Sequence, residues 1–220
     1  LGTDNLGRDV LTRTLCGART SVIIAAVATL INSLIGIFYG GIAGYAGGLT
    51  DNLMMRVVDI LSTVPTTLIV IMLMVVVGQG MGTLIIAMGI ANWTTMARIV
   101  RSQILSLKQR EFVLAARAAN ASSMRILVKH LIPNTAASII VCMTMMVPGA
   151  IFTESFLSFI GLGVSAPNTS LGTLVSDGLA GFRSFPYQLI IPAAVICIII
   201  LALNFIGIGL QAATSPYEEK

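Results

Sequence analysis

Residues 186–210 read PYQLIIPAAVICIIILALNFIGIGL and contain no acidic or basic side chain. A helix of this length rises about 37 Å, at 1.5 Å per residue, which is enough to cross a hydrocarbon layer of about 30 Å. The whole chain is 56% hydrophobic and 10% charged, whereas soluble domains carry about 25% charged residues. The composition therefore excludes an ordinary soluble domain and predicts an all-α, polytopic bundle of transmembrane helices.

Four other apolar stretches are long enough to cross a membrane, so we expect about five spans. They lie at Ser21–Tyr45, Val57–Val77, Met81–Val100 and Thr135–Phe159, ahead of the stretch quoted above. We interpret residues 1–220 as a single transmembrane domain. Because the chain begins at Leu1 rather than at an initiator Met, we also expect that a further span precedes it.

The basic residues indicate how the chain is oriented in the membrane. Seven of the 13 Lys and Arg residues lie between Ala97 and Pro133, and cytoplasmic loops are enriched in these residues. Residues 97–133 are therefore predicted to be cytoplasmic. Arg56 and Lys220 fall on the same side, which gives nine basic residues inside and four outside. This orientation makes residues 1–20 and 161–187 external, with an external N-terminus and a cytoplasmic C-terminus.

The cytoplasmic loop contains the most informative motif, QREFVLAARAANASSMRILVKHLIPN at 109–134. Arg110–Ala119 is rich in alanine and favours a helix, and Asn120 tolerates the left-handed conformation that ends one. Ser122 is a plausible N-cap of a second helix, which Pro133 is expected to end. This basic pair could dock a soluble partner, or it could act only as a topology signal that contacts anionic lipid. Nucleic-acid binding is disfavoured because both ends of the loop are tethered to the membrane.

Small residues recur every fourth position in the first expected span, at Gly36, Gly40, Gly44 and Gly48. Such a face lets another helix approach closely. We expect it to pack against a helix of this subunit or of a partner.

Acidic residues in the spans allow two interpretations. Glu154 lies late in the fourth span, and an ionisable group there usually has a partner or faces water. It is either a residue of a translocation path or a paired carboxylate near the outer interface. Together with Asp59, it leaves open a proton- or ion-coupled secondary transporter, although the sequence shows no convincing internal repeat of the kind such carriers have.

Neither catalytic nor metal-binding residues are expected. The single His130 has no nucleophile beside it in the sequence, and the three cysteines lack metal-ligand spacing. The chain also has no phosphate-binding loop of the form GxxxxGK[ST]. We therefore predict that the chain is not an enzyme and does not itself bind ATP.

The 109–134 segment resembles the EAA loop of the inner-membrane permeases of binding-protein-dependent ABC importers, specifically the dipeptide, oligopeptide and nickel class. Four other stretches are similar to this class: LGTDNLGRD at 1–9, AGYAGGLTD at 43–51, MRVVD at 55–59 and ESFLSFIGLG at 154–163. Two positions depart from the family pattern, because Leu114 stands at the usual glutamate and Asn120 at the usual turn glycine.

The resemblance implies a MetI-like permease fold with six spans, in a bacterial inner membrane. It implies uptake of dipeptides, oligopeptides or nickel by a heterodimer with a second homologous permease, fed by an external substrate-binding protein. Cytoplasmic ATPase subunits would bind ATP and Mg²⁺, with no cofactor in this chain. They would grip a coupling loop that includes Glu111, Ala115, Ala116, Asn120, Ala121, Ser122 and Pro133.

Overall fold

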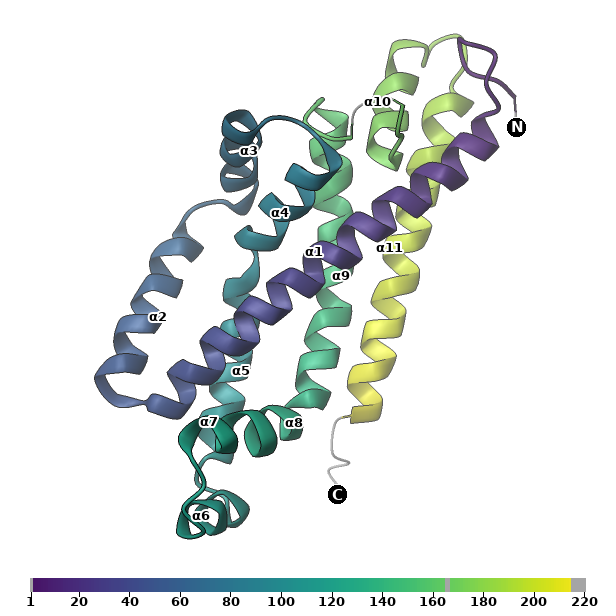
Figure 1. The fold of residues 1–220 in the computed structure, drawn as a ribbon. Coiled ribbons are helices and arrows are strands. Elements are labelled where there is room, and N and C mark those ends of the chain that lie inside the picture. The colour runs from purple at the N-terminus through teal and green to yellow at the C-terminus, as the bar shows by residue number, and fades with distance from the viewer. Residues whose placement is uncertain (1, 165–166, 215–220) are drawn as a thin grey trace.

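The computed structural model describes residues 2–164 and 167–214, and these form a bundle of helices (Figure 1). Helix α1 (Val10–Ala46) runs the length of the bundle, beside α9 (Ala136–Phe159) and α11 (Tyr187–Thr214). These three helices and the segment Met81–Leu107 are each long and apolar enough to cross a membrane. The predicted all-α bundle is confirmed. The described residues contain four helical segments that could span a membrane, or five if the bent pair described below counts as one.

Helix α1 begins well before the apolar run that predicted it. Asp9 is its N-cap, and the Asp9 carboxylate accepts a hydrogen bond from the backbone N–H of Thr12 at 2.7 Å. A carboxylate at this position satisfies one of the free N–H groups of the first turn. The second half of the expected external segment 1–20 is therefore helical. The Asp9 cap, rather than the start of the apolar run, determines where α1 begins.

The expected span Val57–Val77 is not one straight helix. Helix α2 (Gly48–Thr63) ends before Pro65, and α3 (Thr66–Val77) continues at an angle of 82°. Proline disfavours helical geometry in the residue before it, and Val64 is accordingly extended, with φ −86° and ψ 126°. The prediction of a single rod was wrong because an apolar run says nothing about such a break.

The third expected span is interrupted at Asn92 and extends beyond Val100. Helix α4 (Met81–Ala91) and α5 (Trp93–Leu107) meet at this residue. The backbone N–H of Asn92 donates to the side-chain oxygen of Asn32 on α1, at 3.1 Å. Because α5 continues to Leu107, the first part of the predicted loop 97–133 prolongs the span.

The expected external loop 161–187 contains helix α10 (Leu171–Ala180), which a Ser170–Thr173 capping box begins. The N–H of Leu171 donates to Ser21 Oγ on α1 at 3.2 Å. The N-terminal segment reaches the same end of the bundle (Figure 1), where Arg13 pairs with Asp4 at 2.7 Å. Burial raises the pKa of Asp4, but hydrogen bonds from Arg8 and Leu6 outweigh this and hold that pKa at about 2.

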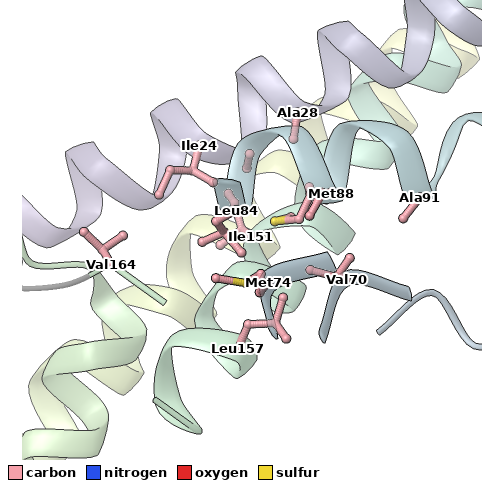
Figure 2. Packing of buried hydrophobic residues seen from close by; sticks show 13 residues of the cluster. Ile24, Ala28, Val70, Met74, Leu84, Met88, Ala91, Ile151, Leu157 and Val164 are labelled. Carbon is pink, nitrogen blue, oxygen red and sulfur yellow. The ribbon is translucent and has the colours of Figure 1, made fainter. Parts of the chain in front are cut away.

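The main apolar core joins α1, α3, α4 and α9 (Figure 2). Ile24 and Ala28 of α1 meet side chains from α3, α4 and α9 there, including Met74, Leu84, Met88, Ile151 and Leu157. Long apolar side chains of this kind fill the space between helices at close packing. The core fixes the position of the α3–α4 pair despite the bend before it.

The glycine face of α1 lies against α5. A Cβ atom on Gly36 would fall 2.5 Å from Met96 Cβ, one on Gly44 would fall 2.9 Å from the Arg101 carbonyl, and one on Gly40 would overlap the Ala97 carbonyl oxygen. Gly48 lies outside this contact. Helix α1 ends at Ala46, so Gly48 starts α2 with φ +55° and has no atom within 4 Å of its would-be Cβ. For Gly48 the packing prediction was wrong, because the four-residue spacing continues past the end of the helix.

Candidate functional site

The segment between α5 and α9 begins with a short helix that ends in a tight turn. Helix α6 spans Glu111–Ala118, and Asn120 after it is left-handed, with φ +56°. The N–H of Asn120 donates to the carbonyl of Arg117 at 2.9 Å, and the N–H of Ala121 donates to that of Ala116 at 3.1 Å. These two bonds form a Schellman motif, in which asparagine takes the place usually held by glycine. The turn geometry is therefore fixed by backbone bonds.

The second half of the segment starts at the expected cap. Ser122 Oγ accepts from the N–H of Arg125 at 3.4 Å, and α7 (Ser123–Ile126) follows. The chain then widens into a π-helix, η1 (Leu127–Leu131), and returns to one α-helical turn, α8 (Ile132–Asn134). Pro133 does not end the helix as predicted. It lies inside α8, and the chain turns into α9 at Thr135, because proline is tolerated in the first turn of a helix.

Apolar side chains anchor this segment, α6–α8, to the bundle. Val113, Ile126 and Leu131 are almost completely buried. They form one cluster with Val100 and Ile104 of α5 and with Ile139 and Cys142 of α9. Ala116 and Ala121, on either side of the turn, pack against the same cluster. This cluster joins α6 and α7 to α5 and α9 in one close-packed unit.

The opposite side of the segment is exposed and carries both apolar and charged groups. Phe112, Leu114, Met124 and Val128 are exposed apolar side chains. Glu111, Ala115, Asn120, Ser122 and Pro133 are exposed as well, whereas Ala116 and Ala121 are half-buried. Large exposed apolar side chains that gather on one projecting segment are typical of an interaction surface. Figure 1 shows that α6 projects beyond the end of the bundle.

Polar contacts connect Arg117 of α6, and Lys108 just before α6, to the end of α1. The guanidinium carbon of Arg117 lies 5.6 Å from the centre of the Tyr45 ring, within the range of a cation–π contact. Lys108 Nζ donates to the carbonyl of Gly44 at 3.0 Å. A cation at the C-terminus of a helix satisfies its free carbonyl groups and opposes its dipole. Three spans, α1, α5 and α9, therefore meet the same short segment.

An ion pair that we did not predict links α2 to α5 at the same end. Arg101 donates two hydrogen bonds to Asp51, from Nε to Oδ1 at 2.5 Å and from Nη2 to Oδ2 at 2.6 Å. The Asp51 side chain is 8% exposed and that of Arg101 is 31% exposed. The two residues are fifty positions apart in the sequence. In the sequence, the only sign of such a pair is the presence of charged residues next to apolar spans.

We expect loss of this ion pair to destabilise the protein more than loss of an exposed one. Removing one partner of a buried pair costs about 3–5 kcal/mol, and the exposure of Arg101 reduces our estimate to about 2 kcal/mol for Asp51→Asn. Asp59→Asn is the matched control because Asp59 and Arg98 are both at least half exposed, and such pairs contribute about 0–1 kcal/mol. Thermal unfolding of the purified variants in detergent measures the difference. Equal melting temperatures would contradict the structural role of Asp51.

The structure places Glu154 far from the α6–α8 segment along α9. Its side chain is fully buried, and Glu154 Oε1 accepts from Ser158 Oγ at 2.7 Å. Ser155 Oγ lies 3.4 Å from the other carboxylate oxygen. No cation pairs with Glu154 among the described residues. The two acidic residues considered for ion coupling are thus in different environments, since Asp59 is exposed beside Arg98.

Comparison with known proteins identifies the family. The family described as "Binding-protein-dependent transport system inner membrane component" matches residues 36–217. The oligopeptide transport system permease protein OppC of Bacillus subtilis (strain 168) is 51% identical over 219 residues, which cover all of this chain and 72% of the relative. This chain belongs to the family of binding-protein-dependent permeases. It is accordingly a multi-pass protein of the inner membrane, and the predicted resemblance is confirmed.

Other permeases of the family are also similar. The dipeptide transport system permease protein DppC of Bacillus subtilis (strain 168) is 50% identical over 216 residues, which cover 98% of this chain and 68% of the relative. OppC of Escherichia coli (strain K12) is 40% identical over 217 residues, which cover 99% of this chain and 72% of the relative. These similarities place the permease in the peptide branch of the family.

Solved structures show the same fold. The MetNI methionine ABC transporter, in an inward-facing conformation, matches with a TM-score of 0.72 and 18% identity, covering 94% of this permease and 97% of that chain. An amino acid ABC transporter with histidines matches with a TM-score of 0.67 and 13% identity, covering 92% and 94%. The predicted MetI-like permease fold is confirmed.

Proposed function

We propose that this permease forms part of the translocation path of an ATP-driven importer of dipeptides or oligopeptides. Its relatives are named as oligopeptide and dipeptide transport permeases, and identity of 40–51% covers nearly the whole chain. The alternative of a proton- or ion-coupled carrier has no support from the comparisons. Asp59 is half exposed in an ion pair with Arg98, and the buried Glu154 accepts hydrogen bonds from Ser155 and Ser158.

The observation that carries the coupling role is the geometry of α6–α8. This segment is held firmly on one side and exposed on the other, so a soluble partner can grip it and move the spans behind it. We assign the partner as a cytoplasmic ATPase subunit, which binds ATP and Mg²⁺ and performs the hydrolysis. The permease itself then performs no catalysis. This assignment puts α6 in the cytoplasm and places α10 and the N-terminal segment outside, where a substrate-binding protein delivers peptide.

The mechanism follows from the contacts of the segment. When two ATPase subunits close, they draw the α6–α8 segments of two paired permeases together. The shared apolar cluster passes this movement to α5 and α9, and the contacts of Tyr45 and Gly44 pass it to α1. Rigid elements with two arrangements are what such a transition requires. The path then alternates between opening inward and opening outward.

Co-purification tests this function directly. The permease, expressed with its neighbouring permease and ATPase subunits, is expected to bring down the ATPases. Phe112→Ser with Leu114→Ser removes exposed apolar contact from α6 and is expected to lower ATPase recovery at least about tenfold, since the loss of two apolar anchors exceeds about 1.4 kcal/mol. Leu179→Ser with Phe182→Ser is the matched control, because these residues are similarly exposed but lie at the α10 end.

Two outcomes would contradict the proposal. If ATPase recovery drops in the α10-end variant but not in the α6 variant, the docking surface lies at the α10 end of the bundle and not at α6. Vesicles that contain only this permease, alone or with its neighbouring permease, and that still accumulate peptide in response to a proton gradient would establish the ion-coupled alternative.

A further inference from the structure

A polar recess lies within the membrane-spanning part of the bundle, between α1, the α4–α5 junction and α9. Its volume is about 200 Å³. Five polar residues line it together with methionine and small residues: Thr29, Asn32, Asn92, Thr95 and Thr153. None of its lining residues is acidic or basic. Thr29 and Asn32 are near the middle of the 37-residue α1, so the recess lies far from both ends of that helix.

The recess adjoins a larger cavity of about 550 Å³. The two share Thr95, Met145 and Met146 as lining residues, and the larger one extends along α9 and α11 as far as Gln211 and Thr214. A polar surface that opened onto lipid tails would be strongly unfavourable. The polar lining of the recess therefore favours a hydrated space inside the transporter over contact with lipid.

The helix break at Asn92 gives the first independent sign of a binding site. Irregular backbone at membrane depth is tolerated where it is buried in protein or lines a water-filled cavity. Here the freed N–H of Asn92 is satisfied by Asn32 Oδ1, which leaves the amide groups of both side chains beside the recess without a further hydrogen bond among the described residues. The break in the span, together with the side chains of Asn32 and Asn92, therefore places several hydrogen-bond donors and acceptors beside the recess.

The second sign is a buried hydroxyl without a partner. Thr29 Oγ1 has no hydrogen-bond partner in the described structure, although Thr29 is only 2% exposed and lines the recess. A threonine hydroxyl in a helix commonly donates to the carbonyl four residues earlier, as Thr144 and Thr153 do on α9, both at 2.9 Å. Because an unsatisfied buried hydroxyl is unfavourable, the geometry favours a ligand that supplies its partner.

We propose that this recess binds the main-chain amide groups of the peptide during its passage, an assignment that rests on the proposed peptide import. Peptide amides are uncharged and offer both donors and acceptors, which matches the hydroxyl and carboxamide groups of the lining. They are also common to all peptides. A recess without charge therefore holds the backbone while it remains indifferent to acidic and basic side chains, as a path shared by many peptides requires.

The test uses the complete transporter, with its second permease, ATPases and binding protein, reconstituted in lipid vesicles. Initial uptake of trialanine is measured together with ATP hydrolysis. Thr153→Val removes a hydroxyl from the recess at nearly constant volume, and we expect uptake to decrease roughly two- to tenfold, as expected from one lost hydrogen bond, while ATP hydrolysis continues. Thr153→Ser retains the hydroxyl and should transport normally. Thr144→Val removes an equally bonded hydroxyl from the same helix outside the recess and should also transport normally.

Thr29→Val separates binding from a structural role. Removing an unpartnered buried hydroxyl is expected to maintain or raise the melting temperature of the permease and yet to lower trialanine uptake. A structural role would lower both together. Uptake at the wild-type rate in both Thr29→Val and Thr153→Val would overturn the proposal, and so would an equal loss in Thr153→Ser.

Charged peptides give the remaining comparison. Ala-Glu-Ala and Ala-Lys-Ala are expected to show the same fold-decrease in Thr153→Val as trialanine, because the lost contact is to the backbone. A decrease confined to one of the charged peptides would overturn backbone recognition in favour of side-chain recognition. If the wild-type transporter imports no peptide at all, the proposed function fails and the recess assignment fails with it. If the wild-type transporter imports peptide and the variants import it equally well, only the recess assignment is overturned.

Discussion

Replacing Gly40 with leucine is expected to leave little folded protein in the membrane. Gly40 lies against the backbone of α5, and its would-be Cβ overlaps the carbonyl oxygen of Ala97. Backbone cannot move aside as a flexible side chain can, so the two helices must separate along the whole glycine face. Overpacking usually costs about 1–3 kcal/mol, and we expect a value at or above the upper end of that range. Size-exclusion chromatography of the detergent extract measures the folded fraction.

Gly209→Leu provides the matched control for Gly40→Leu. Gly209 is also a helical glycine, on α11, but no atom lies within 4 Å of its would-be Cβ. The leucine there replaces a poor helix former with a good one, so the protein should extract as well as the wild type. Normal yield and a monodisperse profile for Gly40→Leu would show that α1 and α5 do not pack as described.

The Asn120→Pro variant is expected to hydrolyse ATP without importing substrate. Proline fixes φ near −65°, whereas Asn120 has φ +56°, so the turn between α6 and α7 cannot form. The substitution also removes the N–H that bonds to the Arg117 carbonyl. The spans should still fold, because the turn lies outside them. We expect uptake in reconstituted vesicles to decrease by more than about tenfold, which corresponds to the loss of about 1.4 kcal/mol of coupling.

Asn120→Gly is the control for this variant because glycine adopts the left-handed conformation without strain. Its uptake should equal that of the wild type. Ala116→Asp, one turn earlier, should reproduce the uncoupling by placing a carboxylate against the apolar cluster of α5 and α9. Peptide import at the wild-type rate by Asn120→Pro, with unchanged ATP hydrolysis, would contradict transmission through this turn.

Local rules predicted the candidate site well. The left-handed residue at Asn120 and the cap at Ser122 both follow from short-range preferences, and the structure has both. The same kind of rule would have located the break at Pro65, since the restriction on Val64 is equally local. An apolar run that is long enough to cross a membrane does not by itself reveal such a break. Pro133 is tolerated because it lies in the first turn of α8, and no sequence pattern indicates the π-helix that precedes this turn.

Contacts between distant residues were beyond prediction from one sequence. Asp51 and Arg101 are far apart in the chain, as are Asn32 and Asn92, and each pair depends on how the helices cross. The hydrogen-bond partners of Glu154 could not be predicted for the same reason. Its serine partners lie on its own helix, but whether the side chain faces a path or the interior depends on how α9 packs against the other helices. Close packing of α1 against another helix could be expected from the glycines, whereas the identity of that helix as α5 could not.

The length of α1 has a mechanical consequence. Its 37 residues form a rod of about 55 Å at 1.5 Å per residue, which touches the Arg117 region at one tip and α10 at the other. A lever of this length that pivots near its middle by about 10° displaces each tip by about 5 Å, in opposite directions. Pulling the inner tips of two such levers together therefore spreads their outer tips apart, so that a single tilt closes one mouth of the channel as it opens the other.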